Sequence, residues 1–263
     1  MSKPTHLVIL VCLLAGALPL GTPAAAEGEA TGQIIGLCYR DGSKGIVLEE
    51  ILKTEGIPYT RLRDLDQLDA LGVKGLFLGN GFDSSAEKVR RFLERGGVVL
   101  SLQPSGRLAA VMGLEETGVQ KNGYLTVEGH GAEIISYEGR FQLFGLSKCY
   151  RGGAPLAALS PGNGYGGLIR VKRGSGTALV IAFDLATTLL TILQPEAECG
   201  KHIDASNVEY DLGRIPQVDL IRRLLVGLFL EHLDVPVLRK WYFPSKYRAM
   251  MAVIGDQDGA SFS

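Results

Sequence analysis

The 263-residue sequence lacks a surplus of charge of either sign and lacks a long apolar run, and each absence excludes a class of protein. Its 27 basic and 28 acidic residues give a formal net charge of -1. Proteins that bind nucleic acid or an anionic membrane surface through their overall field carry a clear basic excess, so neither partner is expected. The apolar run at 7–20 is shorter than the roughly 20 residues that a membrane-spanning helix needs.

Histidines are also scarce, which limits the metal chemistry open to these residues. The four histidines are His6, His130, His202 and His232. No two of them have His-x-x-x-His or any other paired metal-binding spacing. A metal site built by this protein therefore needs ligands other than a histidine pair from these 263 residues.

The first 26 residues have the three parts of a secretory signal. Lys3 supplies the positive start, residues 7–20 the apolar run, and Ala24-Ala25-Ala26 a small-residue cleavage site. We therefore expect an exported protein, secreted, periplasmic or held at the cell envelope, with a mature chain that begins near Glu27. An uncleaved membrane anchor is the alternative interpretation.

Cysteine usage fits export only in part. Beyond Cys12 in the leader, the chain has Cys38, Cys149 and Cys199, an odd number for an exported protein. Cys38 falls in an apolar strand pattern and is interpreted as a small buried hydrophobic residue. Cys149 and Cys199 are candidates for one disulfide, provided that their Cα atoms lie close enough together.

Strand and helix patterns alternate between residues 33 and 233. Apolar runs predict strands at 33–39, 59–61, 74–78, 98–102 and 177–183. Helical periodicity and capping residues predict helices at 44–55 with Ser43 as a cap, at 84–95 with a Ser84–Glu87 capping box, near Leu108, and at 217–232. Parallel strands need a crossover, usually a helix, to return the chain to the same edge of the sheet. The alternation therefore predicts an α/β domain with a mostly parallel sheet flanked by helices.

The last of these helices, 217–232, is apolar on more than one side. Proline precedes it, and charged residues occupy only a narrow face. We expect it to close the domain, with a homodimer contact through the same helix as the alternative.

The order of these elements resembles the class I glutamine amidotransferase-like fold, which is of the flavodoxin-like type. Enzymes of that fold carry a nucleophilic Cys on a tight turn between a strand and a helix. The corresponding turn here follows the strand at 98–102 and reads Gln103-Pro104-Ser105-Gly106. The resemblance thus implies an amidotransferase-like domain without its nucleophile. Ser105 is the hydroxyl on that turn, but no histidine base is evident beside it, and a turn-shaping role is the simpler interpretation.

Two glycine-rich segments invite functional readings. Gly79-Asn80-Gly81 lacks the Gly-x-Gly-x-x-Gly spacing of a dinucleotide-binding loop and is interpreted as a tight turn. Residues 162–167 predict a flexible loop or hairpin connection, in which Tyr165 could stack on a sugar. His130, between two glycines, is expected in a surface loop.

The strongest chemical signal comes last. An apolar strand pattern at 250–254 leads into Gly255-Asp256-Gln257-Asp258-Gly259, preceded by Trp241-Tyr242-Phe243-Pro244. This pattern resembles the opening of secreted polysaccharide deacetylases, the family 4 carbohydrate esterases. In that family the first Asp of an adjacent pair is the general base, and the second binds a divalent metal with a downstream His-x-x-x-His.

Carried onto this sequence, the resemblance implies that Asp256 is the catalytic base and Asp258 a ligand of a divalent metal, with Zn²⁺ expected. The sequence departs from the family at Gln257, which occupies the usual ligand position with a neutral amide, a poorer metal ligand than a carboxylate. An ordinary turn is the competing interpretation of Asp-x-Asp-Gly.

These patterns together predict the front part of a longer, exported, metal-dependent deacetylase that acts on N-acetylated polysaccharide or cell-wall glycan. Residues 33–233 are then a non-catalytic amidotransferase-like domain, 234–248 a linker, and 249–263 the first strand of a deacetylase-type (β/α) barrel. The 263 residues alone should be inactive. The alternative is a non-catalytic exported protein for carbohydrate binding or scaffolding, in which Asp256 and Asp258 merely end a strand.

Overall fold

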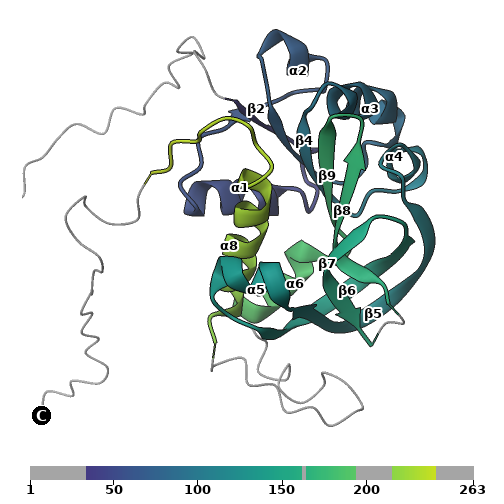
Figure 1. The fold of residues 1–263 in the computed structure, drawn as a ribbon, viewed down its shortest axis with the longest axis vertical. Coiled ribbons are helices and arrows are strands. Elements are labelled where there is room, and N and C mark those ends of the chain that lie inside the picture. Colours follow the sequence, from purple (N-terminus) through teal and green to yellow (C-terminus); the bar gives the residue numbers. More distant parts are fainter. Residues whose placement is uncertain (1–33, 162–163, 194–214, 241–263) are drawn as a thin grey trace, which may run out of the picture. The chain divides into compact units, whose positions relative to one another are not determined.

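The computed structural model describes residues 34–161, 164–193 and 215–240. The described strands form one nine-stranded sheet in the order β2-β1-β3-β4-β9-β8-β7-β5-β6 (Figure 1). These strands are β1 (Ile35–Cys38), β2 (Thr60–Arg61), β3 (Gly75–Leu78), β4 (Val98–Leu102), β5 (Glu115–Val127), β6 (Gly139–Arg151), β7 (Ala154–Ser160), β8 (Gly166–Arg173) and β9 (Gly176–Ile181). The helices are α1 (Ile46–Thr54), α2 (Gln67–Ala70), the short 3₁₀ turn η1 (Asp83–Ser85), α3 (Ala86–Glu94), α4 (Gly106–Val111), α5 (Gly129–Ile135), α6 (Leu185–Leu193) and α8 (Gln217–Leu230).

Half of the sheet is the parallel sheet that the sequence predicts. β2, β1, β3, β4 and β9 pair in parallel, with Leu37 opposite Phe77 and Leu100 opposite Leu179. Every residue of β1, β3, β4 and β9 is buried. Helices cover both faces of a parallel sheet, which is why these strands read as continuous apolar runs.

The other half is antiparallel, so the prediction of a mostly parallel sheet is corrected to a mixed one. β9, β8, β7, β5 and β6 pair in antiparallel fashion. Antiparallel neighbours can be joined by short turns: residues 174 and 175 alone connect β8 to β9, without a helical crossover, whereas helix α5 connects β5 to β6. β5 and β6 each run for 13 residues, and the register of their pairing shifts between Glu116 and Gly118 and again around Asn122, between Lys121 and Gly123.

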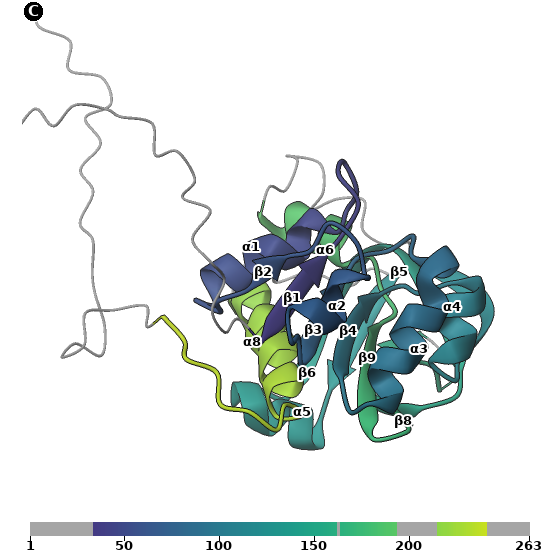
Figure 2. The same cartoon turned by 90° about the horizontal axis from the view of Figure 1, so that it is seen from above.

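Helices lie on both faces of the parallel half, as Figure 2 shows. α1 and α8 cover one face and α3 the other. Phe229 of α8 packs on Phe77 of β3 with ring centroids 4.3 Å apart. α8 also contacts α5 and α6 and has nine buried residues within this chain, so it closes the domain as predicted. Burial inside the domain accounts for the width of its apolar face, and the homodimer stays a prediction.

Three local predictions need correction. The cap of α1 is Gly45 rather than Ser43, whose hydroxyl accepts the Gly45 N–H at 3.3 Å. Ser84 and Glu87 form no capping box, because the Glu87 carboxylate binds Arg90 on the same helix instead. His130 lies in α5 and not in a loop.

The chain after α8 returns to α1 and is attached there. Glu55, directly after α1, is a buried carboxylate that accepts hydrogen bonds from Arg222 Nε at 3.2 Å and Arg239 Nη2 at 2.7 Å. The backbone N–H of Lys240 donates to the carbonyl of Gly56 at 2.8 Å. Residues 234–240 form neither helix nor strand, but this part of the predicted linker is fixed to the domain.

Two further findings concern the predicted export. No helix within the described ranges is long and apolar enough to cross a membrane. Cys38 and Cys149 are buried free thiols, and burial raises the pKa of Cys38 to about 11. The leader at 1–26, Cys199 and residues 241–263 lie outside the described residues.

Candidate functional site at the carboxyl edge of the parallel strands

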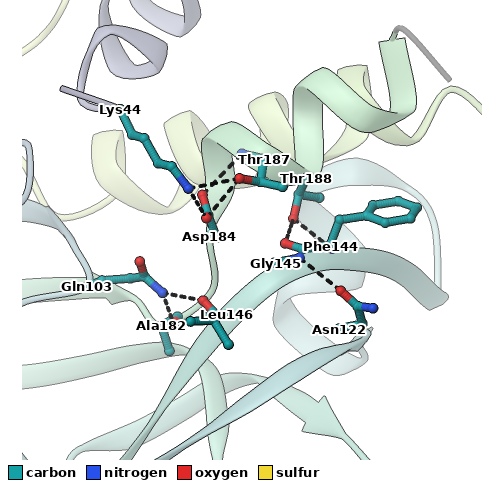
Figure 3. Close-up of polar contacts among 10 residues, drawn as sticks. All are labelled: Lys44, Gln103, Asn122, Phe144, Gly145, Leu146, Ala182, Asp184, Thr187 and Thr188. Atoms are coloured by element: carbon teal, nitrogen blue, oxygen red, sulfur yellow. Dashed lines mark hydrogen bonds and ion pairs between the residues drawn. The ribbon is translucent and has the colours of Figure 1, made fainter. Parts of the chain in front are cut away.

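Ligands of open α/β sheets bind beyond the carboxyl ends of the parallel strands, so a binding or catalytic site is expected at that edge. The loops after β1, β3, β4 and β9 begin there with Tyr39, Gly79, Gln103 and Ala182. Their polar side chains are drawn in part in Figure 3.

Gln103 occupies the turn after β4, where the amidotransferase resemblance places a nucleophile. Its φ is 38°, in the left-handed region that is uncommon for residues other than glycine. Its side-chain Nε2 donates to the carbonyls of Leu146 at 2.6 Å and Ala182 at 3.1 Å (Figure 3). An amide nitrogen has two hydrogens, and both have acceptors here. Gln103 therefore links β4, β6 and β9 and presents no nucleophile.

Strand β6 covers the same turn. The Tyr150 hydroxyl donates to the Pro104 carbonyl at 2.5 Å, and the backbone N–H of Lys148 donates to the carbonyl of Ala182 at 2.7 Å. The antiparallel half therefore curls back, so that the last strand in the sheet order closes over the end of β9.

Neither of the two histidines in the described part of the chain lies beside Ser105. His130 binds Glu231, just after α8, and His232 precedes Leu233, which lines the same hollow as Val98. Val98 begins β4, whereas Ser105 follows the end of β4, and five strand residues span about 16 Å. Both described histidines thus lie at the opposite edge of the sheet, so neither of them is a base that could activate the Ser105 hydroxyl.

Asp184, which follows β9, is the centre of a polar network. Its carboxylate pairs with the Lys44 ammonium. Its Oδ1 accepts the backbone N–H of Thr187 at 3.1 Å, which caps the start of α6. The Thr187 hydroxyl donates to Asp184 Oδ2 at 2.8 Å and accepts from Lys44 Nζ at 2.9 Å. The network therefore joins the start of α1 to the start of α6.

The next residue of α6 connects this network to the antiparallel half. The Thr188 hydroxyl donates to the Phe144 carbonyl and accepts the Phe144 N–H, both at 3.1 Å. The adjoining Gly145 N–H donates to the Asn122 side-chain oxygen at 3.0 Å (Figure 3). Helix α6 is thus anchored to β6, and β6 is anchored to the irregular position of β5.

A second cluster lies where β1 and β2 end. The Glu49 carboxylate accepts hydrogen bonds from the hydroxyls of Tyr39 and of Tyr59, the latter at 2.8 Å, and pairs with Lys53. The Tyr39 hydrogen bond is the largest cause that lowers the pKa of Glu49 to about 2. The Arg61 guanidinium lies over the Tyr39 ring, 3.1 Å from its centroid.

Gly79 belongs to this neighbourhood for a steric reason. A Cβ at Gly79 would lie 2.7 Å from the Cβ of Tyr39, so only glycine allows the two loops to approach. The interpretation of Gly79-Asn80-Gly81 as a turn agrees with this contact.

The chemistry of this edge is that of a satisfied network. Among the described residues, neither a Cys nor a His contacts Gln103 or Asp184, and the Asp184 carboxylate is already paired and hydrogen-bonded. Within residues 34–161, 164–193 and 215–240, no three His, Cys, Asp or Glu side chains come together as metal ligands. Asp256 and Asp258 lie outside the described residues, so their pairing with a metal stays a prediction.

No family model matches this chain, and no curated protein does. Among solved structures it is similar to a β-galactosidase from Rahnella sp. R3, with 15% identity and a TM-score of 0.46, covering 62% of this chain and 31% of that one. It is also similar to the carbohydrate deacetylase Agd3, with 11% identity, 57% and 29% coverage and a TM-score of 0.45. The cytoplasmic protein STM1381 from Salmonella typhimurium LT2 has 11% identity, 74% and 98% coverage and a TM-score of 0.49.

The chain thus spans less than a third of the length of the Rahnella β-galactosidase and of Agd3. Because every one of these TM-scores is below 0.5, the matches assign neither a fold family nor an activity to this chain.

Proposed function

We propose that this chain is the front part of an exported, metal-dependent deacetylase of N-acetylated glycans. In this proposal the leader at 1–26 directs export, and residues 34–240 form a non-catalytic domain of amidotransferase-like type. The substrate is a polysaccharide or cell-wall glycan.

The observation that carries the proposal is the run Gly255-Asp256-Gln257-Asp258-Gly259 after an apolar stretch at 250–254. Two carboxylates directly after an apolar run suit a reaction that needs one group to accept a proton and another to hold a cation. The lead-in Trp241-Tyr242-Phe243-Pro244 adds to the resemblance to polysaccharide deacetylases.

The ligand chemistry of the side chains favours Asp258 over Gln257 as the metal-binding residue. The carboxylate of Asp258 is a good ligand for a divalent ion such as Zn²⁺, and the neutral amide of Gln257 is a poor one. A bound Zn²⁺ supplies a polarised acetyl carbonyl and an acidified water. Asp256 accepts a proton from the attacking water. The four histidines have no paired spacing, so the remaining ligands belong to sequence beyond residue 263.

The turn at Gln103 supports the non-catalytic role of the described domain. The Gln103 side chain, in the nucleophile's place, donates both amide hydrogens to backbone carbonyls, and neither described histidine lies near Ser105. Amidotransferase-type catalysis would need a cysteine on this turn, and the turn has none.

The test is made on the full-length protein with Zn²⁺ and an N-acetyl-chito-oligosaccharide, by measuring acetate release and bound metal. We expect Asp258→Ala to lower the metal content. We expect Asp256→Ala to keep the metal but slow turnover by about a hundredfold, the scale for losing a general base. Ser105→Ala is the matched control and should leave the rate unchanged.

If neither aspartate variant alters metal content or rate, the motif is only a turn. The exported binding or scaffolding protein then replaces the deacetylase. A reading frame without a His-x-x-x-His after residue 263 would count against the deacetylase as well.

A further inference from the structure

A separate hollow of about 370 Å³ opens between the β6–β7 turn and the start of β8. Its lining includes Arg151, Gly152, Pro155, Gly164, Tyr165 and Ile169. The volume falls at the lower end of the roughly 300 to 1,000 Å³ of small-molecule pockets. The hollow is distinct from the network at Asp184, since none of its lining residues belongs to that network.

Tyr165 gives this hollow an ordered aromatic surface. The residue is partly buried and packs against the hydrophobic core. Its backbone carbonyl accepts the N–H of Leu159 at 2.8 Å, which fixes the segment to β7. A tyrosine ring that is already held in place binds a flat apolar surface with little further loss of conformational entropy.

The rest of the lining is mostly bare backbone. A Cβ at Gly166 would lie 2.6 Å from Ile169 Cγ1, and one at Gly153 would lie 2.5 Å from Ile169 Cγ2. Packing over Ile169 therefore requires glycine at both positions. Glycine has no side chain to cover its peptide groups, so the backbone of Gly152, Gly153 and Gly164 itself forms part of the wall of the hollow.

The small number of charged residues in the lining restricts which ligands the hollow can bind. Arg151 is the one charged residue in this lining, and its guanidinium already pairs with Glu115 Oε2 at 3.0 Å at an exposed position. A phosphate or a polyanion usually requires several cations or a helix N-terminus. A neutral, hydroxyl-rich ring requires only the combination found here, an aromatic surface next to backbone hydrogen-bonding groups.

We infer that this hollow is a glycan subsite that holds one pyranose ring against Tyr165. The ring's apolar face packs on the tyrosine, and its hydroxyls bind the peptide groups of the glycine segments. The inference rests on the proposed function for the choice of glycan, but not for the existence of the subsite. Tyr150 lines the same hollow and binds Pro104, so the subsite shares a wall with the Gln103 turn.

The test is a titration of the ¹⁵N-labelled full chain with N-acetyl-chitotriose, followed by NMR. We expect saturable shifts of the amides of Gly152, Gly164 and Gly166, with the amides near Lys44 unmoved. Tyr165→Ala should weaken binding by about tenfold, which is 1.4 kcal/mol. Tyr165→Phe should stay within about threefold of the original affinity, because stacking needs only the ring.

Val119→Ala is the control, since Val119 is exposed on β5 and lies outside the lining. The NMR map of the unaltered chain decides the matter even if Tyr165→Ala unfolds. Shifts confined to other residues would overturn the subsite. So would the absence of a saturable shift at about 10 mM sugar, because a specific site should bind at or below that concentration. If the full-length protein deacetylates the sugar but these amides do not shift, only the subsite is rejected. If the amides shift but the protein releases no acetate, only the proposed activity is rejected.

Discussion

Glu55 and Arg222 form a buried ion pair across the contact between α1 and α8, with Glu55 Oε1 and Arg222 Nε 3.2 Å apart. The Glu55 side chain is 1% exposed and that of Arg222 18%. A carboxylate removed from water to this extent depends on its partners, because their loss leaves an uncompensated charge.

We therefore expect Arg222→Met to lower the free energy of unfolding by about 2 kcal/mol, somewhat below the usual cost of breaking a buried pair because Arg239 also binds Glu55. Chemical denaturation measures the change. Arg223→Met is the matched control, since Arg223 is the exposed next residue of the same helix and should change stability by less than about 0.5 kcal/mol. Equal effects of the two variants would show that the pair does not stabilise the contact.

A second prediction concerns how the segment after α8 is held. Arg239 binds both the side chain and the backbone carbonyl of Glu55, and the neighbouring Lys240 N–H donates to Gly56. Arg239→Met should raise the exchange rate of the Lys240 amide hydrogen by about tenfold or more. Local opening of the segment costs less free energy in this variant, because the Arg239 contacts no longer have to be broken. Hydrogen exchange read by NMR checks this. An amide that exchanges equally fast in both proteins would mean that the segment is held by other contacts.

Gln103 should respond to substitution in an unusual order. Gln103→Ala removes the hydrogen bonds to Leu146 and Ala182 while the left-handed backbone remains, and we expect a loss of about 2 kcal/mol. Gln103→Gly removes the same bonds but relieves the left-handed strain, which is worth about 1 kcal/mol. Gln103→Gly should therefore destabilise the protein less than Gln103→Ala, although glycine is usually more destabilising than alanine at ordered positions. Thermal unfolding of the two variants gives the order, and a more stable alanine variant would contradict it.

His130 should make stability depend on pH. Hydrogen bonds to Glu231 and then to Glu133 raise its pKa above the ordinary value of 6.5. A raised pKa in the folded state means that the contribution is fully present below pH 6.5 and is lost as the pH rises through the folded pKa. The melting temperature of the original protein should thus exceed that of His130→Gln at pH 6, and the difference should shrink by pH 9.

His232 acts in the opposite direction, because burial lowers its pKa. Comparing the original protein with His130→Gln at each pH removes most of this second contribution, because the charge of His130 is only the smallest of the causes that shift the His232 pKa. A difference that stays constant between pH 6 and pH 9 would show that the charge of His130 does not stabilise the contact between α5 and α8.

The parallel half of the fold is predictable from the sequence because its strands carry their own signal. β1, β3 and β4 are buried on both faces, so each is an apolar run that ends at a turn, interrupted by a polar side chain only at Ser101 of β4. The antiparallel half carries no such signal. The first part of β5, from Glu115 to Lys121, is almost entirely exposed, and it is a strand only because it pairs with β6. Pairing of that kind depends on tertiary structure rather than on local pattern.

The candidate site shows the same division. The absence of a Cys from the turn after β4 is visible in the sequence, but the left-handed backbone of Gln103 and its bonds to two other strands are not. Asp184 reads in sequence as the residue that closes a strand, because its partner Lys44 is 140 positions away. An aspartate just before a helical pattern does signal a cap, and that signal would have identified its bond to Thr187. Asp256 and Asp258 remain predictions.

The strand order of the sheet also determines when, during translation, strand β4 can pair with both of its neighbours. β4 lies between β3 and β9, yet residues 103–175 separate it from β9 along the chain. Until β9 leaves the ribosome, the apolar run Val98–Leu102 has an unpaired edge, and such edges recruit strands from other chains. Closing so long a loop is also slow. A nascent chain whose emerged part ends before residue 176 should therefore depend on chaperones far more than one whose emerged part extends past Asp184, when β9 can pair with β4.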